Sequence, residues 1–338
     1  MLRHESETVE RFSRSLVGSN KPDQRTPMRE RIVISGGAGF VGSHLAEALA
    51  EEYSVVVFDN FSTGNERNLV TAKANNIRIV RGDIRNFDLA RTVLRKAKAV
   101  FHEAAIVSVT RSILQPVLTN DVNVNGTLNL LLAAVANKVP WFINASSSSV
   151  YGEPKERWRD EDIQSRPISV YAVSKLASER YCLAFHRTYK LNAVCLRYFN
   201  VYGPRQRIGR YSGVITTFIN NALKGKPLEI FGDGRQTRDF TYVTDVVQAN
   251  LSALGNEEAV GEVFNIGTGV STSINHLAKS VQRLQPNPPR IIYRAPRAGD
   301  VLHSEAVISK ARRILHYRPR VELSDGLGNV YKWLKSGN

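Results

Sequence analysis

Short apolar runs alternate with longer amphipathic stretches along the chain from Arg31 onward. Runs rich in Val and Ile are typical of strands buried on both faces, while apolar residues three and four positions apart are typical of helices. This alternation predicts right-handed crossovers between parallel strands, and therefore an α/β fold with a doubly wound parallel sheet. The expected strands are residues 31–35, 54–58, 77–81, 98–103, 140–145 and 192–198.

Two of the predicted helices are long, and each is apolar on more than one side. They cover residues 116–137 and 171–189. A helix with two apolar stripes can bury one on the sheet and the other against a neighbouring subunit. We therefore expect a homodimer formed through these two helices.

The regular alternation weakens after residue 202, where Gly and Arg become frequent and the elements shorter. A smaller C-terminal α/β lobe is expected there, over the carboxyl ends of the strands, where open α/β sheets bind ligands. Residues 1–30 are polar and without a sustained period, which indicates a flexible N-terminal extension. The predicted organisation is this extension, a nucleotide-binding domain over 31–200 and mainly a substrate lobe over 201–338, with a return of the later chain to the core sheet left open.

The composition narrows the function classes. A chain of 338 residues with 42% hydrophobic content is long enough for two lobes. No apolar run approaches the roughly 20 residues of a membrane span, and the N-terminus lacks the order of a signal peptide, so a cytoplasmic protein without a membrane partner is expected. Cys182 and Cys195 lack metal-site or disulfide spacing, which predicts buried thiols and no metal.

The formal net charge of +15 is spread along the chain. Modest clusters lie at residues 205–210 and 312–320, and no motif that reads DNA or RNA accompanies them. We expect no specific nucleic-acid partner. Attraction of an anionic nucleotide ligand explains part of this positive charge better.

A glycine-rich turn joins the first predicted strand to the first predicted helix. Gly36, Gly39 and Gly42 are three apart, and such a turn aims backbone N–H groups and a helix N-terminus at a phosphate. The triplet alone would also fit an ordinary turn. However, Asp59 ends the next strand, close to the offset of about 20 residues expected for a carboxylate that accepts both ribose hydroxyls. It would repel a 2′-phosphate, so NAD is the expected cofactor rather than NADP.

Tyr171 and Lys175 form the most informative polar pair. Residues four apart share one face of a helix, so the phenol and the ammonium can converge on one ligand. A nearby cation lowers the pKa of a tyrosine, which makes it a usable proton acceptor for a substrate hydroxyl. An exposed surface pair is the alternative. The serine run at residues 146–149 favours the site, because it follows an apolar strand and brings hydroxyls to the carboxyl edge of the sheet.

Together, these motifs and their order resemble the extended short-chain dehydrogenase/reductase family, and more narrowly its nucleotide-sugar 4-epimerases that act on UDP-GlcNAc and UDP-glucose. The resemblance covers roughly residues 31–335 and implies a Rossmann-type sheet and NAD. The motifs that carry it are the glycine turn, Asp59, the Tyr171/Lys175 pair, the serine run, and residues 82–84, 102–105, 123–127, 196–200 and 238–240.

The resemblance also implies roles for individual residues. Ser147, Tyr171 and Lys175 match the family's catalytic residues. The matching cofactor contacts are Gly36, Gly39, Phe40, Val41, Gly42, Asp59, Asn60, Gly64, Asp83, Ile84, Ala104, Ala105, Asn123, Tyr171, Lys175 and Phe199. The matching substrate contacts are Ser108, Ser147, Ser149, Tyr171, Asn200, Val214, Phe231, Arg238, Arg297, Asp300 and Ser304.

The expected reaction and sugar depend on positions at which related enzymes carry different residues from this chain. Related dehydratases carry an Asp-Glu pair, and related decarboxylases a Glu, where this chain has Ser148 and Ser149, which favours epimerisation. Ser304 stands where strict UDP-glucose epimerases have a bulky Tyr, so UDP-GlcNAc and UDP-GalNAc are the expected substrates, with UDP-glucose and UDP-galactose as further ones. UDP-glucuronate is an alternative, with its C6 carboxylate contacted by Arg111 or by neighbouring hydroxyls of the loop at residues 108–112. A non-catalytic regulator that binds NAD and a nucleotide sugar is another, and the intact Ser147, Tyr171 and Lys175 argue against it.

Overall fold

The computed structural model describes residues 29–69, 76–209, 212–296 and 301–337. A seven-stranded sheet forms its centre, with neighbouring strands in the order β12-β7-β5-β4-β1-β2-β3, all paired in parallel. The strands are β1 (Arg31–Ser35), β2 (Ser54–Asp59), β3 (Ile77–Arg81), β4 (Ala97–His102), β5 (Trp141–Ser147), β7 (Asn192–Tyr198) and β12 (Val263–Ile266).

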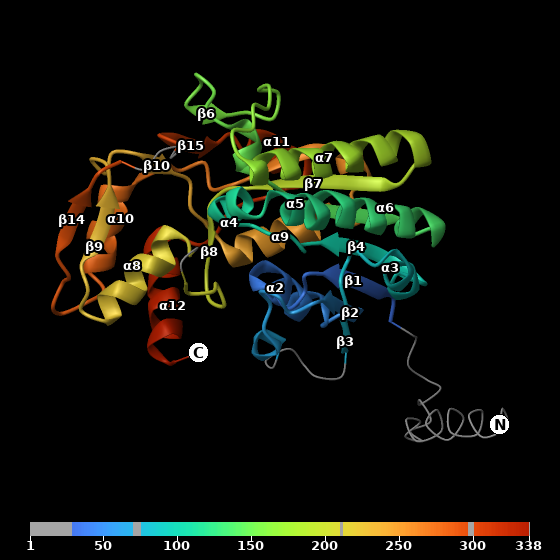
Figure 1. The fold of residues 1–338 in the computed structure, drawn as a ribbon, viewed down its shortest axis with the longest axis horizontal. Coiled ribbons are helices and arrows are strands. Elements are labelled where there is room, and N and C mark those ends of the chain that lie inside the picture. Colours follow the sequence, from blue (N-terminus) through green and yellow to red (C-terminus); the bar gives the residue numbers. More distant parts are fainter. Residues whose placement is uncertain (1–28, 70–75, 210–211, 297–300, 338) are drawn as a thin grey trace.

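Helices cover both faces of this sheet (Figure 1). On one face, α2, α9 and α11 share an apolar core with the strands, and on the other face α3, α6 and α7 do so. The helices of this domain are α2 (Phe40–Leu49), α3 (Phe87–Val93), α4 (Val109–Leu114), α5 (Pro116–Asn120), α6 (Gly126–Ala136), α7 (Val170–Tyr189), α9 (Val243–Ala253) and α11 (Ser309–Ile314). Short helical turns are η1 (Glu66–Leu69), the π-helical η2 (Asp121–Asn125), η3 (Ser148–Tyr151) and η4 (Glu257–Ala259).

The predicted fold class is confirmed. The six expected strands coincide with β1, β2, β3, β4, β5 and β7 to within two residues at each end. The seventh strand, β12, comes from residues 263–266, so the later chain returns to the large sheet. β12 follows the part of the chain in which the regular alternation weakens, with strands as short as two residues, which is why the sequence left this return open.

The expected continuous helix over 116–137 is wrong in one respect. Between α5 and α6 the chain makes the π-helical turn η2. Inside this turn, the Asn123 side chain accepts from the Ile106 N–H (2.8 Å) and donates to the Ile106 carbonyl (3.1 Å) and the Ser174 hydroxyl (2.9 Å). The π-helical turn thus lies where the Asn123 side chain bonds both the loop after β4 and helix α7. The periodicity of apolar residues does not indicate such a turn, so the sequence did not predict it.

A second lobe has its own apolar core, at the left of Figure 1. Helices α8 (Val214–Leu223), α10 (Ile274–Gln282) and α12 (Leu323–Lys335) pack there beside the parallel pair β9 (Leu228–Phe231) and β14 (Ile291–Arg294). The remaining short strands are β6 (Trp158–Arg159), β8 (Val201–Tyr202), β10 (Thr237–Arg238), β11 (Thr241–Tyr242), β13 (Thr272–Ser273) and β15 (His303–Ala306). In the part of the chain that the structure describes, no helix is both long and apolar enough to cross a membrane.

His102, at the end of β4, is a buried polar residue of the sheet. Its Nε2 lies 2.8 Å from the Thr127 hydroxyl and its Nδ1 lies 2.8 Å from the Ser35 hydroxyl. The Thr127 hydroxyl donates its proton to the Asn123 carbonyl at 2.6 Å, so it accepts from Nε2, and Ser35 donates to Nδ1. Burial, with the nearby Lys175 charge, lowers the pKa of His102 to about 3. The imidazole is therefore neutral in the folded protein at neutral pH.

This burial predicts a pH dependence of stability. Below the unfolded-state pKa of 6.5, the unfolded chain takes up a proton at His102 that the folded chain does not, so stability falls as the pH falls toward 3. Between pH 7 and pH 5.5, the protein is expected to lose about 1 kcal/mol more unfolding free energy than a His102→Gln variant. Urea unfolding at both pH values measures this, and equal losses would contradict it.

Candidate active site

A cavity of about 730 Å³ opens at the carboxyl ends of β1 to β5 and β7, with walls from both lobes. Its size is within the usual range for small-molecule sites. Eighteen residues expected from the sequence line it: Gly36, Gly39, Phe40, Val41, Gly42, Asp59, Asn60, Asp83, Ile84, Ala104, Ala105, Ser147, Ser149, Tyr171, Lys175, Asn200, Arg238 and Ser304. Residues distant in the chain thus meet in one cavity.

The glycine turn forms one end of this cavity. Gly36 has a φ of +73°, and a Cβ there would lie 2.6 Å from the Ala104 nitrogen. A Cβ on Gly42 would lie 2.3 Å from the Gly36 carbonyl oxygen, so helix α2 lies against the turn. Helix α2 begins at Phe40 without a capping side chain. Its first N–H groups are therefore available to an anion at the cavity wall.

Asp59 ends β2 beside this turn and is 8% exposed. Its two carboxylate oxygens accept from the Ala38 N–H at 2.9 Å and the Phe61 N–H at 2.8 Å. A carboxylate has about four acceptor positions, so each oxygen keeps one for a ligand. An uncapped helix N-terminus, a glycine-rich turn and an oriented carboxylate fit the pyrophosphate and ribose hydroxyls of NAD.

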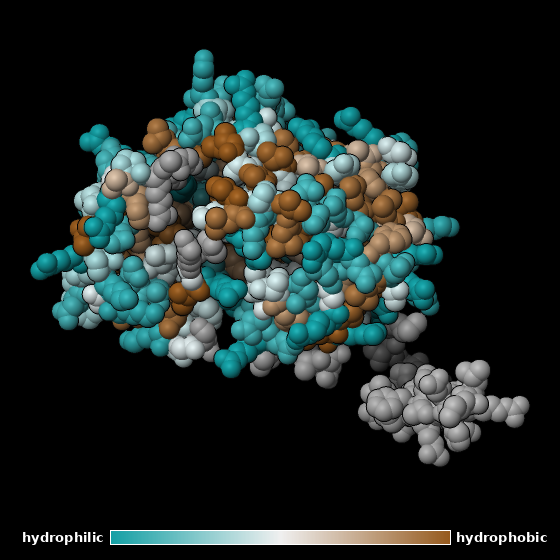
Figure 2. Space-filling model, viewed as in Figure 1, coloured by the Kyte–Doolittle hydropathy of each residue, from teal (hydrophilic) through white to brown (hydrophobic). Residues whose placement is uncertain are grey.

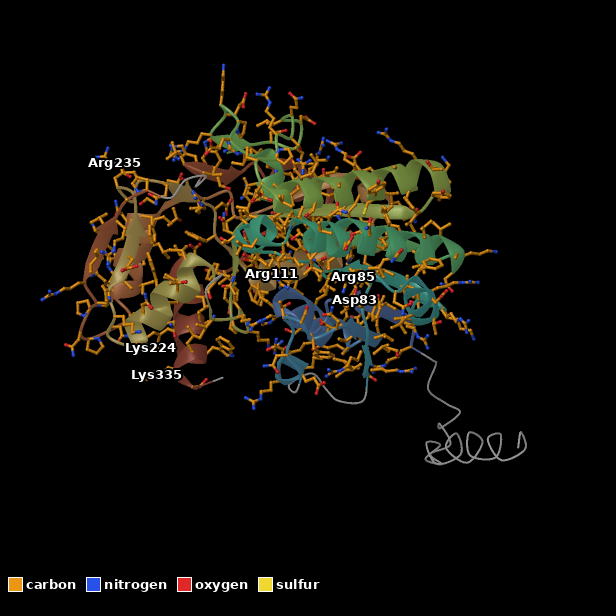
Figure 3. All side chains as sticks on the ribbon, in the orientation of Figure 1. Asp83, Arg85, Arg111, Lys224, Arg235 and Lys335 are labelled. Atoms are coloured by element: carbon orange, nitrogen blue, oxygen red, sulfur yellow. The ribbon has the colours of Figure 1, made fainter. Side chains whose placement is uncertain are left out.

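Asp83 lies further along the same wall, next to Arg85 (Figure 3). Its carboxylate accepts four hydrogen bonds: from the Arg85 N–H and Nε at 2.9 Å each, from Arg85 Nη2 at 2.8 Å and from the Asn60 amide at 2.9 Å. These bonds, that of the Arg85 side chain above all, lower the pKa of Asp83 to about 2. A base amino group that reaches Asp83 has to replace one of these donors, which the sequence did not indicate.

Ser147, Tyr171 and Lys175 meet on the opposite part of the cavity wall. Ser147 is the last residue of β5, and the other two are in the first turns of α7. The Ser169 hydroxyl caps α7 by accepting from the Ala172 N–H at 3.1 Å, and the Ser112 hydroxyl of α4 accepts from the Tyr171 N–H at 3.1 Å. Lys175 is only 4% exposed. The start of α7 is thus held in place by neighbouring hydroxyls.

The expected effect of Lys175 on the pKa of Tyr171 is not found. Burial raises the pKa of the Tyr171 hydroxyl, and the opposing influence is a hydrogen bond with Ser147. Burial also lowers the pKa of Lys175. Helical spacing brings the two side chains to one face, but it does not reveal how strongly the surrounding protein disfavours both charges.

A buried ion pair lies beneath these three residues. Arg197 of β7 donates to the Glu179 carboxylate of α7 through Nη2 at 2.7 Å and Nε at 2.9 Å. The Ser146 hydroxyl of β5 donates to the same carboxylate at 2.8 Å. Of the serine run, Ser146 therefore supports the sheet. Ser149 lines the cavity, and its buried hydroxyl has no hydrogen-bond partner in the described chain.

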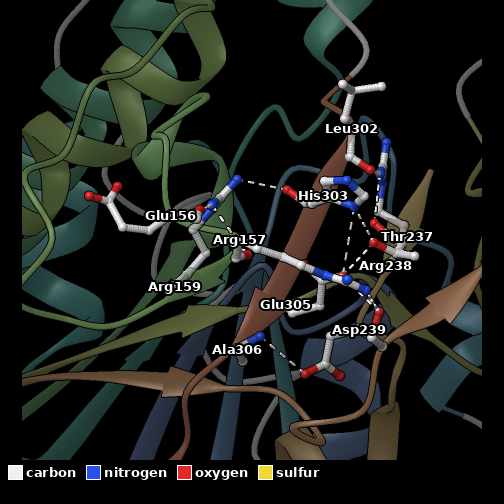
Figure 4. A network of polar contacts seen from close by, with 11 residues as sticks. Glu156, Arg157, Arg159, Thr237, Arg238, Asp239, Leu302, His303, Glu305 and Ala306 are labelled. Carbon is white, nitrogen blue, oxygen red and sulfur yellow. Dashed lines mark hydrogen bonds and ion pairs between the residues drawn. The ribbon is translucent and has the colours of Figure 1, made fainter.

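Strands β10 and β15 form the wall on the side of the second lobe. They pair in parallel, with Arg238 opposite Ser304, and both residues line the cavity. Figure 4 shows the polar network that holds this wall. In it, the buried Glu305 carboxylate accepts from Thr237 and from Arg157 at 3.2 Å, and Arg159 donates to the His303 carbonyl at 2.7 Å.

Some predicted site residues do not line this cavity. Asn123 is 1% exposed and engaged with Ile106 and Ser174, Gly64 packs under Ala38, and Phe199 is fully buried. Those expected to contact substrate but found away from the cavity wall are Ser108, Val214 and Phe231. Arg297 and Asp300 lie outside the described residues.

Other cavity residues were not assigned a site role from the sequence. They include Glu103 and Tyr198, which follow or end central strands, and Arg205 and Arg207 of the connection to the second lobe. Their positions directly after apolar strands, or after Gly203-Pro204, were an available signal. In the described chain, His, Cys, Asp and Glu side chains do not gather in a group of three or more that could hold a metal.

Comparison with known proteins gives consistent matches. The model of the NAD dependent epimerase/dehydratase family matches residues 32–267. A putative UDP-glucose 4-epimerase of Methanocaldococcus jannaschii is 40% identical over 310 residues, which cover 91% of this chain and 99% of that protein.

Two solved structures have the same fold over nearly the whole chain. The UDP-N-acetylglucosamine 4-epimerase of Methanobrevibacter ruminantium has a TM-score of 0.88 at 34% identity, covering 92% of this chain and 100% of its own. The UDP-glucuronic acid 4-epimerase of Bacillus cereus, in complex with UDP-glucuronic acid and NAD, has a TM-score of 0.84 at 36% identity, covering 91% and 100%. These similar proteins share a reaction type and differ in the sugar.

Proposed function

This chain belongs to the NAD dependent epimerase/dehydratase family, and we propose that it catalyses the reversible C4 epimerisation of a UDP-hexose. The observation that carries the proposal is one cavity that joins an NAD-compatible turn to Ser147, Tyr171 and Lys175. Similarity to UDP-sugar 4-epimerases over nine-tenths of the chain supports the reaction type.

The cavity residues suggest how this reaction proceeds. NAD supplies a hydride acceptor that is regenerated at each turnover, so there is no net oxidation. Tyr171 takes the proton of the C4 hydroxyl and later returns it. The Ser147 hydroxyl lowers the pKa of Tyr171, and we propose that it also hydrogen-bonds the same sugar oxygen. Arg238 and Asn200 are the proposed partners of the diphosphate, because guanidinium and amide N–H groups suit phosphate oxygens.

We propose an N-acetylated UDP-hexosamine as the preferred substrate. Ser304 lines the cavity opposite Arg238, and its small side chain leaves space beside the proposed diphosphate contact. The unpartnered Ser149 hydroxyl offers the sugar a further hydrogen bond, since a buried hydroxyl without a partner is otherwise unfavourable.

UDP-glucuronate is a second candidate, favoured by Arg111. This arginine lines the cavity from α4, and its Nε donates to Gln115 at 3.0 Å. The remaining guanidinium donors suit a sugar carboxylate.

The proton-transfer role of Tyr171 is tested by Tyr171→Phe. This variant is expected to retain bound NAD but to lose at least about 100-fold in epimerisation rate, because it lacks the proton acceptor. The measurement is separation of C4 epimers after incubation with UDP-GlcNAc, UDP-glucose or UDP-glucuronate. Tyr189→Phe, on the exposed end of the same helix, is the matched control and should behave like the unmodified protein. Retained activity in Tyr171→Phe would refute the assignment, and no interconversion of any sugar by the unmodified protein would refute the function.

The sugar preference is tested at Ser304. Ser304→Tyr is expected to lower kcat/KM for UDP-GlcNAc about ten-fold more than for UDP-glucose, because the added ring fills the space for the N-acetyl group. Ser304→Ala keeps that space and should leave the ratio of the two values nearly unchanged. An equal loss on both sugars in Ser304→Tyr would count against the proposal.

We propose a second copy of the chain as the occupant of an exposed apolar face. Figure 2 shows apolar side chains gathered over α4, α5 and α7, which pack against one another. Ile113, Leu114 and Val117 are 62%, 64% and 74% exposed, and Val173 of α7 is 53% exposed. Monomers rarely expose a contiguous apolar patch of this kind, and two such patches would bury each other in a two-fold dimer.

The dimer is tested by Val117→Glu. In a two-fold dimer both chains contribute the same residue, so this substitution places two negative charges in the apolar interface. The variant is therefore expected to sediment as a monomer, whereas the unmodified protein sediments as a dimer. Val270→Glu places the same charge at an apolar residue, 59% exposed, that lies outside these helices, and should not change the mass. A monomeric unmodified protein would contradict the proposal.

A further inference from the structure

The chain that leads from the large sheet to the second lobe is fastened to helix α2. Arg205 Nη2 donates to Glu47 Oε2 at 2.7 Å, and the Arg205 side chain is only 14% exposed. The preceding carbonyl, that of Pro204, lies 3.1 Å from His44 Nε2. Because a carbonyl oxygen can only accept, the His44 ring donates through Nε2. His44 and Glu47 are three residues apart, so one face of α2 makes both contacts.

The same face of α2 begins at the cofactor end of the cavity. Phe40, four residues before His44, is the first residue of the helix and lines the cavity. Its ring meets the His44 ring edge-on, with 6.1 Å between the centroids, and it packs against the apolar core of the second lobe. Helix α2 therefore carries the proposed pyrophosphate site at its first turn and holds the connection to the second lobe over the next two turns.

Arg205 has a backbone conformation that side chains other than glycine rarely adopt. Its φ is +68°, and Asn200, earlier in the same connection, has a φ of +34°. Both residues line the cavity. Such conformations persist only where the surrounding contacts enforce them, and they gather at ligand sites. The ion pair with Glu47 and the hydrogen bond from His44 are two contacts that hold the chain in this conformation.

The connection also carries one of the proposed diphosphate partners. Asn200 precedes β8, whose Tyr202 belongs to the core of the second lobe, and its amide donates to the Asp239 carbonyl at 2.9 Å. Arg238, the other proposed diphosphate partner, directly precedes Asp239. A shift of this connection against α2 would thus move both diphosphate partners relative to the NAD turn. The proposed catalytic residues belong to β5 and α7 instead.

We propose that Glu47 is a positioning residue for nucleotide-sugar binding: through its ion pair with Arg205, it fixes the diphosphate contacts of the second lobe relative to the NAD turn. The inference rests on the proposed binding of a UDP-sugar in this cavity. Without the pair, the ligand itself would have to bring the second lobe into place, which weakens binding. The chemical step would change little once the substrate is bound, because the Arg197–Glu179 pair holds β7 and α7 independently of α2.

The test is a double-mutant cycle on Glu47→Gln and Arg205→Gln in the full chain saturated with NAD. Glu47→Gln is expected to raise the Kd for UDP, measured by titration calorimetry, about five-fold, and the KM for the UDP-sugar that is converted by the same factor, with kcat within about two-fold of its unmodified value. In the Arg205→Gln background, Glu47→Gln is expected to have no further effect. Glu51→Gln, at an exposed residue just beyond the end of α2, is the matched control and should change none of these constants.

An unchanged Kd for UDP in Glu47→Gln would overturn the inference. An equal rise of Kd in both backgrounds would overturn it too, because the effect would then bypass Arg205, as would a fall in kcat with an unchanged KM. If Arg205→Gln folds poorly, Arg205→Asn provides the background, since Asn tolerates a positive φ. Calorimetry with UDP needs no turnover, so a failure of this inference is distinguishable from a failure of the epimerase proposal.

Discussion

The buried ion pair between Arg197 and Glu179 is the interaction on which the site depends. The two side chains are 2% and 0% exposed, so the loss of either would leave an unpaired charge in the core at a cost of about 3 to 5 kcal/mol. The pair joins β7 to α7, and the Ser146 hydroxyl adds β5. It therefore specifies how α7 sits on the sheet. Lys175 lies one turn before Glu179 and Tyr171 one turn earlier, while Ser147 directly follows Ser146. The positions of all three proposed catalytic residues therefore depend on this charged contact.

Polar side chains of α4 and of the π-helical turn also hold helix α7 in position. Asn123, in the π-helical turn, bonds both the loop after β4 and Ser174 of α7, and Ser112 of α4 receives the Tyr171 N–H. These contacts join the loop after β4, which packs against the glycine turn, to the helix that carries the proposed base. Catalysis by positioned groups requires such fixed relative positions. The proposed dimer face lies on the same helices, so association of two chains would further restrict their motion.

Burial also determines the electrostatics of the site. It raises the pKa of Tyr171, lowers that of Lys175 and keeps His102 neutral. Each of these shifts opposes charge formation, so the Tyr171 phenolate that the proposed reaction needs depends on a particular partner, Ser147. On the cofactor side, by contrast, Asp83 is held ionised by Arg85. A short list of contacts thus decides which groups carry charge in the cavity.

The sequence by itself determined the strands of the sheet, the glycine turn, Asp59 and the spacing of Tyr171 and Lys175, because these depend on local periodicity and on residues a fixed number of positions apart. Only the tertiary structure decided that Asn123 bonds both the loop after β4 and α7, that four donors occupy Asp83 and that β12 returns to the sheet. Asn123 and β12 contact residues distant in the chain, and Asp83 combines its near neighbour Arg85 with the distant Asn60. The energies of these contacts depend on burial and on competing partners, and neither quantity exists until the chain has folded.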